Sequence, residues 1–434
     1  MNEVQGGQNH PKGLYVLFAT EMWERFSFYS MLSLFTLYMR DGTEGFGWAA
    51  ADATSLYANY LMFVYFSPLV GGWLADRKLG YRRAVMAGGL FFMAGHLLLS
   101  FKSLPIVYLA LTCLVLGNGL FKPNVSAMVG NLYPEGSHLK DRAFNIFYMG
   151  INIGAFMAPV AMEAIKSKWG YHPAFATAAL GMLVSVGILW AFRGLVEDKG
   201  RAEAPAEGSS PAAPRALDEV PDWKRCMALV IIYFIVIVFW MVFHQNGSTL
   251  TYWANDNTAW SVSGTISNAI NPFWVVTLTF PLVWFWKWLD RRGLEPSTPT
   301  KMGFGMLLTG LSFLLLFWAA KTGEAMAPAG SPYAFKVSPV WLIASYGVVT
   351  LGELMLSPMG LSLVSKVAPV RLRGVMMGGW FAATAVGNKL TAIGVYWDQW
   401  LHSTFFLVLG AMALAMSVVL FLLVRPLKRW MPGV

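Results

Sequence analysis

Cysteine, histidine and charged residues are all scarce in this chain of 434 residues, and each scarcity excludes a class of protein. Only 13% of the residues are charged, whereas soluble domains carry about 25%. The 2 cysteines, Cys113 and Cys226, are not placed for a disulfide, and no Cys or His spacing fits a metal site. The 6 histidines are scattered, which argues against a membrane-embedded enzyme. We therefore expect no catalytic residues, no metal and no organic cofactor.

Hydrophobic residues, by contrast, make up 56% of the chain. They gather in runs near the 20 residues that an α-helix needs to cross a bilayer. We therefore predict an all-α integral membrane protein with twelve transmembrane helices. The expected spans are residues 15–39, 54–74, 84–101, 105–132, 144–165, 173–192, 227–253, 266–288, 302–320, 340–367, 375–396 and 404–424.

The positive residues predict the orientation, because cytoplasmic loops of membrane proteins are enriched in Lys and Arg. Most of the 32 Lys and Arg fall in the amino terminus, the even-to-odd loops and the carboxyl terminus, while Arg25, Lys122 and Lys389 fall inside helices. Both termini are therefore expected in the cytoplasm. The net charge of +9 follows from this bias and needs no nucleic-acid partner.

The first dozen residues are polar and lack a cleavage site, so no removable signal peptide is expected. We expect a multi-pass plasma-membrane protein, placed in the inner membrane if the source is bacterial. Its expected partners are the lipid bilayer and a small molecule, and we expect it to act as a monomer.

The apolar pattern stops between Arg193 and Trp223, where Ala, Pro, Glu, Gly and Ser dominate. Such a composition is typical of a flexible linker. We predict an amino-terminal six-helix bundle over residues 1–193, a cytoplasmic linker over 194–223 and a carboxyl-terminal six-helix bundle over 224–434. Two such bundles suit a carrier that rocks about a central site.

A faint repeat supports the division into halves. Residues 71–83 read GGWLADRKLGYRR after the second span, and residues 288–294 read WLDRRGL after the eighth. The first run resembles the loop signature of the major facilitator superfamily, GGxLADRxLGxRR. We expect Asp76, Arg77, Arg82 and Arg83 to form a gating loop, since an Asp at a helix end can hold Arg neighbours in one state and release them in another. The alternative is a plain turn with positive-inside anchors.

Charged residues also occur inside predicted spans, where each costs roughly 3 kcal/mol or more at mid-membrane. Glu21, Glu24 and Arg25 lie within about one helical turn and can pair locally. Lys122 has no acid nearby in the sequence, so the Glu21/Glu24 pair is its expected partner, and Glu353 is the only acid in the tenth span. A buried Lys and carboxylate that exchange partners would link proton binding to conformation. The alternative is a neutralised interfacial triad with snorkelling side chains.

The run at residues 21–29, EMWERFSFY, resembles the ExxERFxYY signature of the proton-coupled oligopeptide transporter family (POT, or PTR), a branch of the major facilitator superfamily. Other runs agree with this family along nearly the whole chain, except in the linker. They are FYMGINIG at 147–154, GLFKPN at 119–124, ELMLSP at 353–358, NP at 271–272, MGGWF at 377–381 and GN at 387–388.

The resemblance implies roles for residues that match the family motifs. It places proton coupling on Glu21, Glu24, Arg25, Lys122 and Glu353, with Lys122 near a substrate carboxylate and Glu353 receiving the amino group. Substrate-lining residues implied in the same way are Tyr29, Tyr65, Tyr148, Asn152, Asn271, Ser357 and Trp380. For each of the tyrosines, ordinary packing between helices is the alternative.

Two positions depart from the family pattern. Many peptide-transporting members have an Arg where this chain has Leu32, and relatives commonly have an acid where it has His244. The two changes leave the site balanced in charge but weaken the recognition of a zwitterionic peptide. Because imidazole titrates near neutral pH, we expect His244 to bind substrate or a proton. The alternative is a His satisfied by a neighbouring helix.

The expected function is therefore proton-coupled symport by alternating access, importing di- or tripeptides or peptide-like small amphoteric solutes, with protons as the coupling ion. The alternative within the family is a non-peptide solute such as a modified amino acid, an organic anion or a peptide-like natural product. A channel is disfavoured, since two halves with charges at the midplane suit rocking better than a permanent pore.

Overall fold

The computed structural model describes residues 10–133, 139–196, 216–369 and 372–432. Helices account for nearly all regular structure in these ranges, apart from an isolated bridge between Thr258 and Val337. Before the predicted linker the helices are α1 (Lys12–Arg40), α2 (Ala50–Leu74), α3 (Tyr81–Leu98), α4 (Leu104–Asn131), α5 (Leu139–Trp169) and α6 (Tyr171–Ala191). After it come α7 (Asp222–Phe243), α8 (Thr249–Asp256), α9 (Ile270–Asp290), α10 (Thr298–Met326), α11 (Pro339–Val367), α12 (Arg373–Leu390) and α13 (His402–Trp430).

Each of the twelve expected spans overlaps a helix of this structure over nearly its whole length, which confirms the all-α membrane fold. Within the described ranges, eight helical stretches are long and apolar enough to cross a membrane by length and composition alone. The helix α1 is not among them, because it carries Glu21, Glu24 and Arg25.

The prediction of one continuous seventh helix over 227–253 was wrong in detail. The helix α7 ends at Phe243, a 3₁₀ turn covers His244–Gly247, and α8 begins at Thr249. The Gln245 side chain sits at this break and donates to the carbonyls of Met241 (3.2 Å) and Thr391 (3.1 Å). His244 is therefore at the end of a helix and not well inside one.

The structure divides into two compact units. The first unit comprises residues 1–31, 67–158 and 172–206, and the second comprises 32–66, 159–171 and 207–434. The division cuts through α1, α2 and α5, so one end of each of these helices belongs to the second unit. The boundaries 1–193 and 224–434 of the predicted bundles stay a prediction, and residues 197–215 of the predicted linker lie outside the described ranges.

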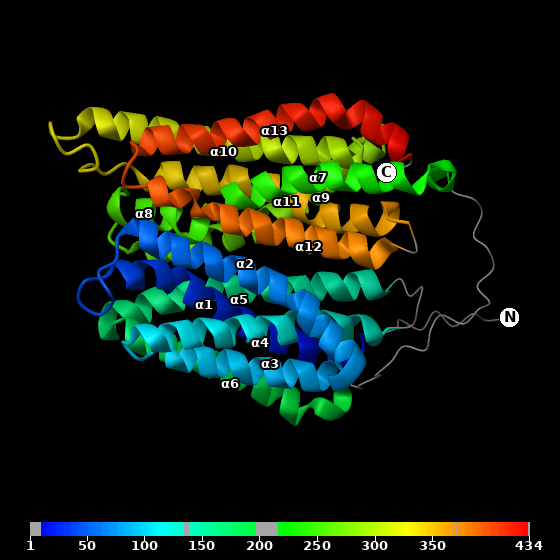
Figure 1. The fold of residues 1–434 in the computed structure, drawn as a ribbon, viewed down its shortest axis with the longest axis horizontal. Coiled ribbons are helices and arrows are strands. Elements are labelled where there is room, and N and C mark those ends of the chain that lie inside the picture. Colours follow the sequence, from blue (N-terminus) through cyan, green and yellow to red (C-terminus); the bar gives the residue numbers. More distant parts are fainter. Residues whose placement is uncertain (1–9, 134–138, 197–215, 370–371, 433–434) are drawn as a thin grey trace. The chain divides into compact units, whose positions relative to one another are not determined.

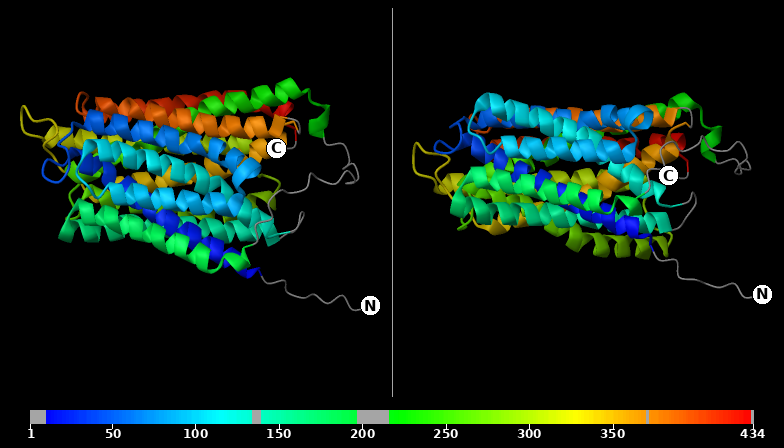
Figure 2. Two further views of the ribbon diagram at one scale, coloured as in Figure 1. Left: turned by 60° about the horizontal axis from the view of Figure 1, so that its bottom comes forward. Right: turned by 90° about the horizontal axis from the view of Figure 1, so that it is seen from below.

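Glycines and hydroxyl groups bring the helices of the first unit close together. The helices α3 and α4 run side by side (Figures 1 and 2), and a Cβ added at Gly88 would lie 2.8 Å from the Gly117 carbonyl oxygen. The α1–α6 contact is fixed by hydroxyls, since Ser27 donates to Ala178 O and Ser185 to Thr20 O, each at 2.7 Å. This packing holds the charged turn of α1 in the interior.

Glycines and side-chain hydroxyls also bring the helices of the second unit close together. The helices α10 and α13 lie side by side (Figure 1), and Ser417 of α13 donates to the Gly303 carbonyl of α10 at 2.9 Å. The α10–α11 contact is close at Gly305, where an added Cβ would meet the Gly352 carbonyl oxygen at 2.8 Å. Because Gly352 directly precedes Glu353, this close approach places an acidic residue between packed helices.

Candidate functional site

The charged turn of α1 forms a buried ion-pair cluster in the first unit. Glu21, Glu24 and Arg25 expose 2%, 0% and 3% of their surface. Arg25 Nη2 donates to Glu24 Oε1 at 2.6 Å, and Arg25 Nε contacts both the Glu24 carboxylate and Glu21 Oε1, the latter at 3.3 Å. The guanidinium also lies 4.7 Å from the centre of the Phe28 ring. One Arg thus holds two carboxylates away from the lipid, and its contacts with them offset part of the cost of burying all three charged groups.

The α1 cluster is not fully satisfied by Arg25. Glu21 Oε2 is buried and accepts no hydrogen bond from any residue within the described ranges. Lys122, in α4 of the same unit, lies close enough for its charge to act on Glu21, Glu24 and Arg25. Two carboxylates, one guanidinium and one ammonium therefore share one interior region, and their charges sum to zero.

The other predicted residues of the first unit lie on α1 and α5. The Tyr29 ring packs edge-on against Phe28 at 5.4 Å, and Tyr29 is near enough to interact with Arg25. Tyr148 is 43% exposed, while Asn152 is buried and donates to the Tyr148 carbonyl at 2.9 Å. Asn152 therefore bonds within its own helix in this structure.

A second acidic position is built from α9 and α11 in the second unit. Asn271 Nδ2 donates to Glu353 Oε2 and to Thr350 Oγ1, each at 2.9 Å. Glu353 forms no ion pair with any cation that the structure describes. Ser357 follows one turn later on α11, where it is partly buried. The Asn271 amide thus orients a carboxylate whose charge is balanced by no cation within the described ranges.

Aromatic rings surround His244 at the end of α7. Its ring stacks on Trp240, with centroids 5.0 Å apart and an interplanar angle of 22°, and meets the edge of Tyr65 at 5.6 Å. Only 8% of His244 is exposed. Both His244 and Tyr65 were predicted as site residues from the sequence, and the structure brings their rings together.

Trp380 of α12 packs against α11 at a glycine. A Cβ added at Gly360 would lie 1.8 Å from a Trp380 ring carbon, so only glycine leaves room for the indole. The ring also meets Tyr233 edge-on, with centroids 6.3 Å apart. Trp380 is 3% exposed, which places it in the interior of the second unit.

The predicted gating loop follows α2 in the first unit. Residues 75–79 form a short π-helix, and Gly80 makes the turn into α3 with a φ of 75°. Asp76 and Arg77 are exposed, and Arg77 lies 5.4 Å from the centre of the Trp73 ring. No ion pair to Asp76 occurs in the part of the chain that the structure describes. A role for Asp76, Arg77, Arg82 and Arg83 in gating stays a prediction.

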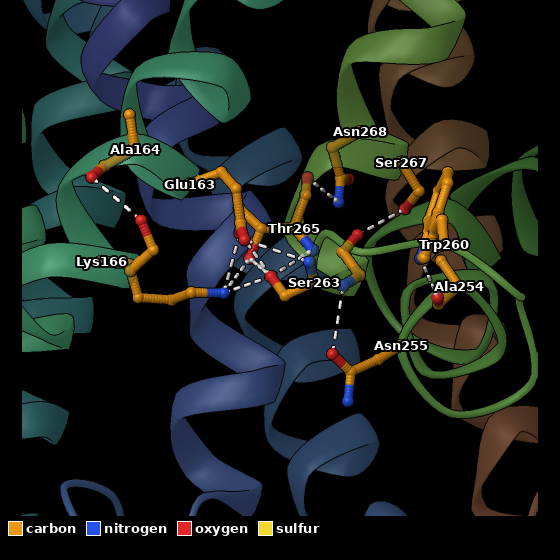
Figure 3. Close-up of polar contacts among 12 residues, drawn as sticks. Glu163, Ala164, Lys166, Ala254, Asn255, Trp260, Ser263, Thr265, Ser267 and Asn268 are labelled. Atoms are coloured by element: carbon orange, nitrogen blue, oxygen red, sulfur yellow. Dashed lines mark hydrogen bonds and ion pairs between the residues drawn. The ribbon is translucent and has the colours of Figure 1, made fainter.

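The second unit contains a polar cluster that the sequence analysis missed. Here it is called the α5 clasp, and it consists of Glu163 and Lys166 of α5 with Ser263 and Thr265 (Figure 3). Glu163 and Lys166 pair at 2.8 Å, Glu163 Oε1 accepts from the Ser263 backbone N–H at 3.0 Å, and Lys166 donates to Thr265 Oγ1 at 3.1 Å. The Ser263 hydroxyl contacts both charged side chains.

Similar contacts join α1 and α2 to the second half of the chain. Thr36 Oγ1 donates to the Gly247 carbonyl at 2.9 Å, and a Cβ at Gly247 would lie only 2.0 Å from Tyr57 Oη. Arg40 pairs with Asp256 at 3.1 Å. These contacts lie toward the ends of α1, α2 and α5 that belong to the second unit.

Comparison with known proteins shows the family. A sequence profile described as the POT family matches residues 82–210 and 207–403. The chain belongs to the POT family. It is therefore a membrane transporter and not an enzyme, as the motifs predicted.

Relatives and solved structures cover almost the whole chain. A di-/tripeptide transporter of Lactococcus lactis subsp. lactis (strain IL1403) is 29% identical, over 98% of this chain and 97% of the relative. The crystal structure of a peptide transporter POT in complex with sulfate is 30% identical with a TM-score of 0.86, covering 100% of this chain and 97% of that one. A POT family transporter in complex with 5-aminolevulinic acid is 25% identical, also with a TM-score of 0.86, covering 98% of both chains.

Within this POT-family chain, the signal for the α5 clasp was weak in the sequence. Glu163 and Lys166 stand at i and i+3 near the end of an expected span, which also suits a simple interfacial ion pair. Ser263 and Thr265 lie about 100 residues further on, in a run without helical periodicity. Only the fold brings the two segments together, so spacing alone could not identify the cluster.

Proposed function

We propose that this POT-family chain is a proton-coupled symporter that imports di- or tripeptides or peptide-like amphoteric solutes by alternating access. The observation that carries the proposal is Glu353, a carboxylate held by Asn271 and balanced by no described cation. An unbalanced carboxylate inside a membrane protein is costly, and a substrate ammonium would neutralise it. The family resemblance assigns Lys122 to the opposite, carboxylate end of the substrate.

The proposed coupling uses the charge balance of the α1 cluster with Lys122. Its four charged groups sum to zero, so binding of one proton to Glu21 or Glu24 would leave a net charge of +1. A substrate carboxylate would restore neutrality, which makes proton and substrate binding mutually favourable. The buried Glu21 Oε2, which accepts no hydrogen bond from the described residues, offers a place for that proton.

In this proposal the second unit contributes the gate. The contacts of Thr36 and Arg40 at the carboxyl end of α1, together with those of the α5 clasp, would form this gate. The bias of Lys and Arg predicts that the amino end of α1 is cytoplasmic, so the gate would face outward. We also propose that the protein acts as a monomer in a bacterial inner membrane.

Removal of a charged coupling group should abolish gradient-driven uptake. We predict that Lys122→Ala and Glu24→Gln reduce uptake driven by an imposed proton gradient to background, while the purified proteins remain folded. Uptake of a radiolabelled dipeptide into proteoliposomes measures the gradient-driven transport. Exchange of labelled for unlabelled dipeptide across the membrane without a gradient tests whether the binding site still works. Lys102→Ala is the matched control, since Lys102 is exposed outside the helices. Full gradient-driven uptake in either coupling variant would contradict the scheme.

A non-peptide solute is the second candidate, favoured by Leu32 and His244. The first position is buried and apolar, and the second is a titratable ring stacked on Trp240. The 5-aminolevulinic acid in one solved relative is an amphoteric non-peptide solute. Competition between a labelled dipeptide and a panel of dipeptides, modified amino acids and organic anions would separate the candidates. If only the non-peptide compounds reduce uptake of the labelled dipeptide, the transported substrate is a non-peptide solute.

A further inference from the structure

Lys389 is a charged residue inside a predicted span that the proposed coupling scheme does not use. It lies in the last turn of α12, and its ammonium donates a hydrogen bond to the Asn59 side-chain carbonyl in the first half of α2. Within the described ranges it forms no ion pair with any acid. A neutral amide from a distant part of the chain is therefore the partner of this cation.

The contact between Lys389 and Asn59 lies away from the ends of α2. Asn59 is about 13 Å along the helix axis from Ala50, the first residue of this helix. A cation at such a depth is costly unless it faces water or a polar group. Lys389 and Asn59 are both partly exposed. Because hydrocarbon cannot solvate an ammonium, the Asn59 carbonyl and water must share its solvation.

The same stretch of α2 packs closely against the second half of the chain. Thr54 Oγ1 and Tyr252 Oη of α8 lie 3.1 Å apart in a hydrogen bond. A Cβ added at Gly394, in the turn after α12, would lie 2.8 Å from Thr54 Cγ2, so glycine permits this approach. Thr54 and Tyr252 are fully buried, whereas Asn59 and Lys389 are not. The Lys389–Asn59 pair therefore lies at the edge of this closed contact, which is called the α2–α12 seam.

The chemistry of the partner at position 59 determines how strongly the ammonium is held. An Asp there would form an ion pair, and breaking such a pair away from bulk water would strand two charges. The Asn59 amide instead accepts a single charge-assisted hydrogen bond, which a water molecule can replace once the helices separate. The end of a helix already favours a cation. That effect requires no particular residue at position 59, so substitution there separates the two explanations.

We propose that the Lys389–Asn59 hydrogen bond is a latch of the α2–α12 seam, made when the seam is closed and broken when it opens. The neutral partner keeps the latch weak enough for the seam to open in each transport cycle. A charged partner at the same position would hold the seam closed. This inference rests on the alternating access of the proposed function and is independent of the transported solute.

Distances between spin labels in the purified full-length protein test the latch. Labels at Asp52→Cys of α2 and Lys321→Cys of α10, both exposed, follow the movement of α2 in a Cys113→Ser and Cys226→Ser background. Pulsed electron paramagnetic resonance in nanodiscs gives the populations of the closed and open forms. We expect Asn59→Ala to shift the closed-to-open ratio about 3- to 30-fold toward the open form, and Asn59→Asp to shift it by a similar factor toward the closed form.

A Lys389→Met background supplies the matched control, as in a double-mutant cycle. There Asn59→Ala should leave the ratio unchanged, and Asn59→Asp should no longer favour the closed form. Two forms whose ratio ignores both substitutions at position 59, or effects that persist without Lys389, would overturn the latch. A single distance in the wild type, with and without dipeptide, would contradict alternating access itself and the latch with it.

Discussion

Arg25 and Asn271 are the residues that organise the two charged positions of this transporter. Arg25 binds both Glu21 and Glu24 within α1, whereas Asn271 reaches from α9 to Glu353 on α11. The Glu21–Arg25 part of the first arrangement could be predicted, because residues at i and i+4 share a helix face. The second could not, since Asn271 and Glu353 are 82 positions apart and meet only through helix packing.

Glu353 should determine the binding of the substrate's amino group. We predict that Glu353→Gln raises KM for a dipeptide about 10- to 100-fold, because a charge-assisted contact of roughly 1.5–3 kcal/mol is lost. Asn271→Ala should have a smaller effect, since the carboxylate keeps its charge and loses only its orientation. Uptake kinetics measure both variants. An unchanged KM in Glu353→Gln would remove this residue from the binding site.

His244 should influence substrate affinity or its pH dependence. The His244 ring is buried between Trp240 and Tyr65. Protonation of this ring would therefore change the electrostatic interaction with any substrate group bound beside it. We predict that His244→Ala alters KM or shifts the pH profile of uptake measured between pH 5 and 8. Identical affinity and an identical profile would assign His244 to helix packing alone.

At the scale of elements, the helices follow from the sequence and their interruptions do not. Long apolar runs predicted every span, because a bilayer of fixed thickness demands helices of about that length. The break at His244–Gly247 was not predicted, although the run from His244 to Thr249 is polar and contains Gly247. The Gln245 amide donates to the Met241 carbonyl one turn earlier and to the distant Thr391 carbonyl, and the second contact does not follow from spacing along the chain.

The α5 clasp connects α5 to the segment before α9, and its two charged side chains both belong to α5. Its ion pair, Glu163 with Lys166, lies within one helix, and the opposing segment supplies the neutral Ser263 and Thr265. Separation of the two segments would therefore leave the ion pair intact. Opening breaks hydrogen bonds to charged groups, worth roughly 1.5 kcal/mol or more each, but leaves the two charges paired with each other.

Removal of the Ser263 hydroxyl should favour the open form of this contact. We predict that Ser263→Ala shifts the closed-to-open ratio about 5- to 30-fold, the equivalent of 1–2 kcal/mol. Pulsed electron paramagnetic resonance between labels at Lys168→Cys and Ser261→Cys, in a background with Cys113→Ser and Cys226→Ser, would report the distance. The control is Ser167→Ala, whose hydroxyl bonds only to Ala164 O in α5. A distance distribution that Ser263→Ala leaves unchanged would refute a closing role for the clasp.

At the scale of the whole molecule, composition and motifs were enough to predict the membrane fold and the family. The fold follows because 56% hydrophobic residues in spaced runs fit only a helical membrane protein. The family follows because several motifs recur in order along the chain. The identity of the substrate does not follow from the motifs. Leu32 and His244 stand where relatives commonly have charged residues, and substrate selectivity depends on the charge distribution of the whole site.

In the proposed function, a proton gradient drives the uptake of a peptide-like zwitterion. The most direct test is uptake of a labelled dipeptide into proteoliposomes that contain only the wild-type protein, with the outside more acidic than the lumen. We predict accumulation above the external concentration, loss of that accumulation when a protonophore is added, and saturation with dipeptide. Uptake that stops at equal concentrations on both sides and ignores the protonophore would contradict it.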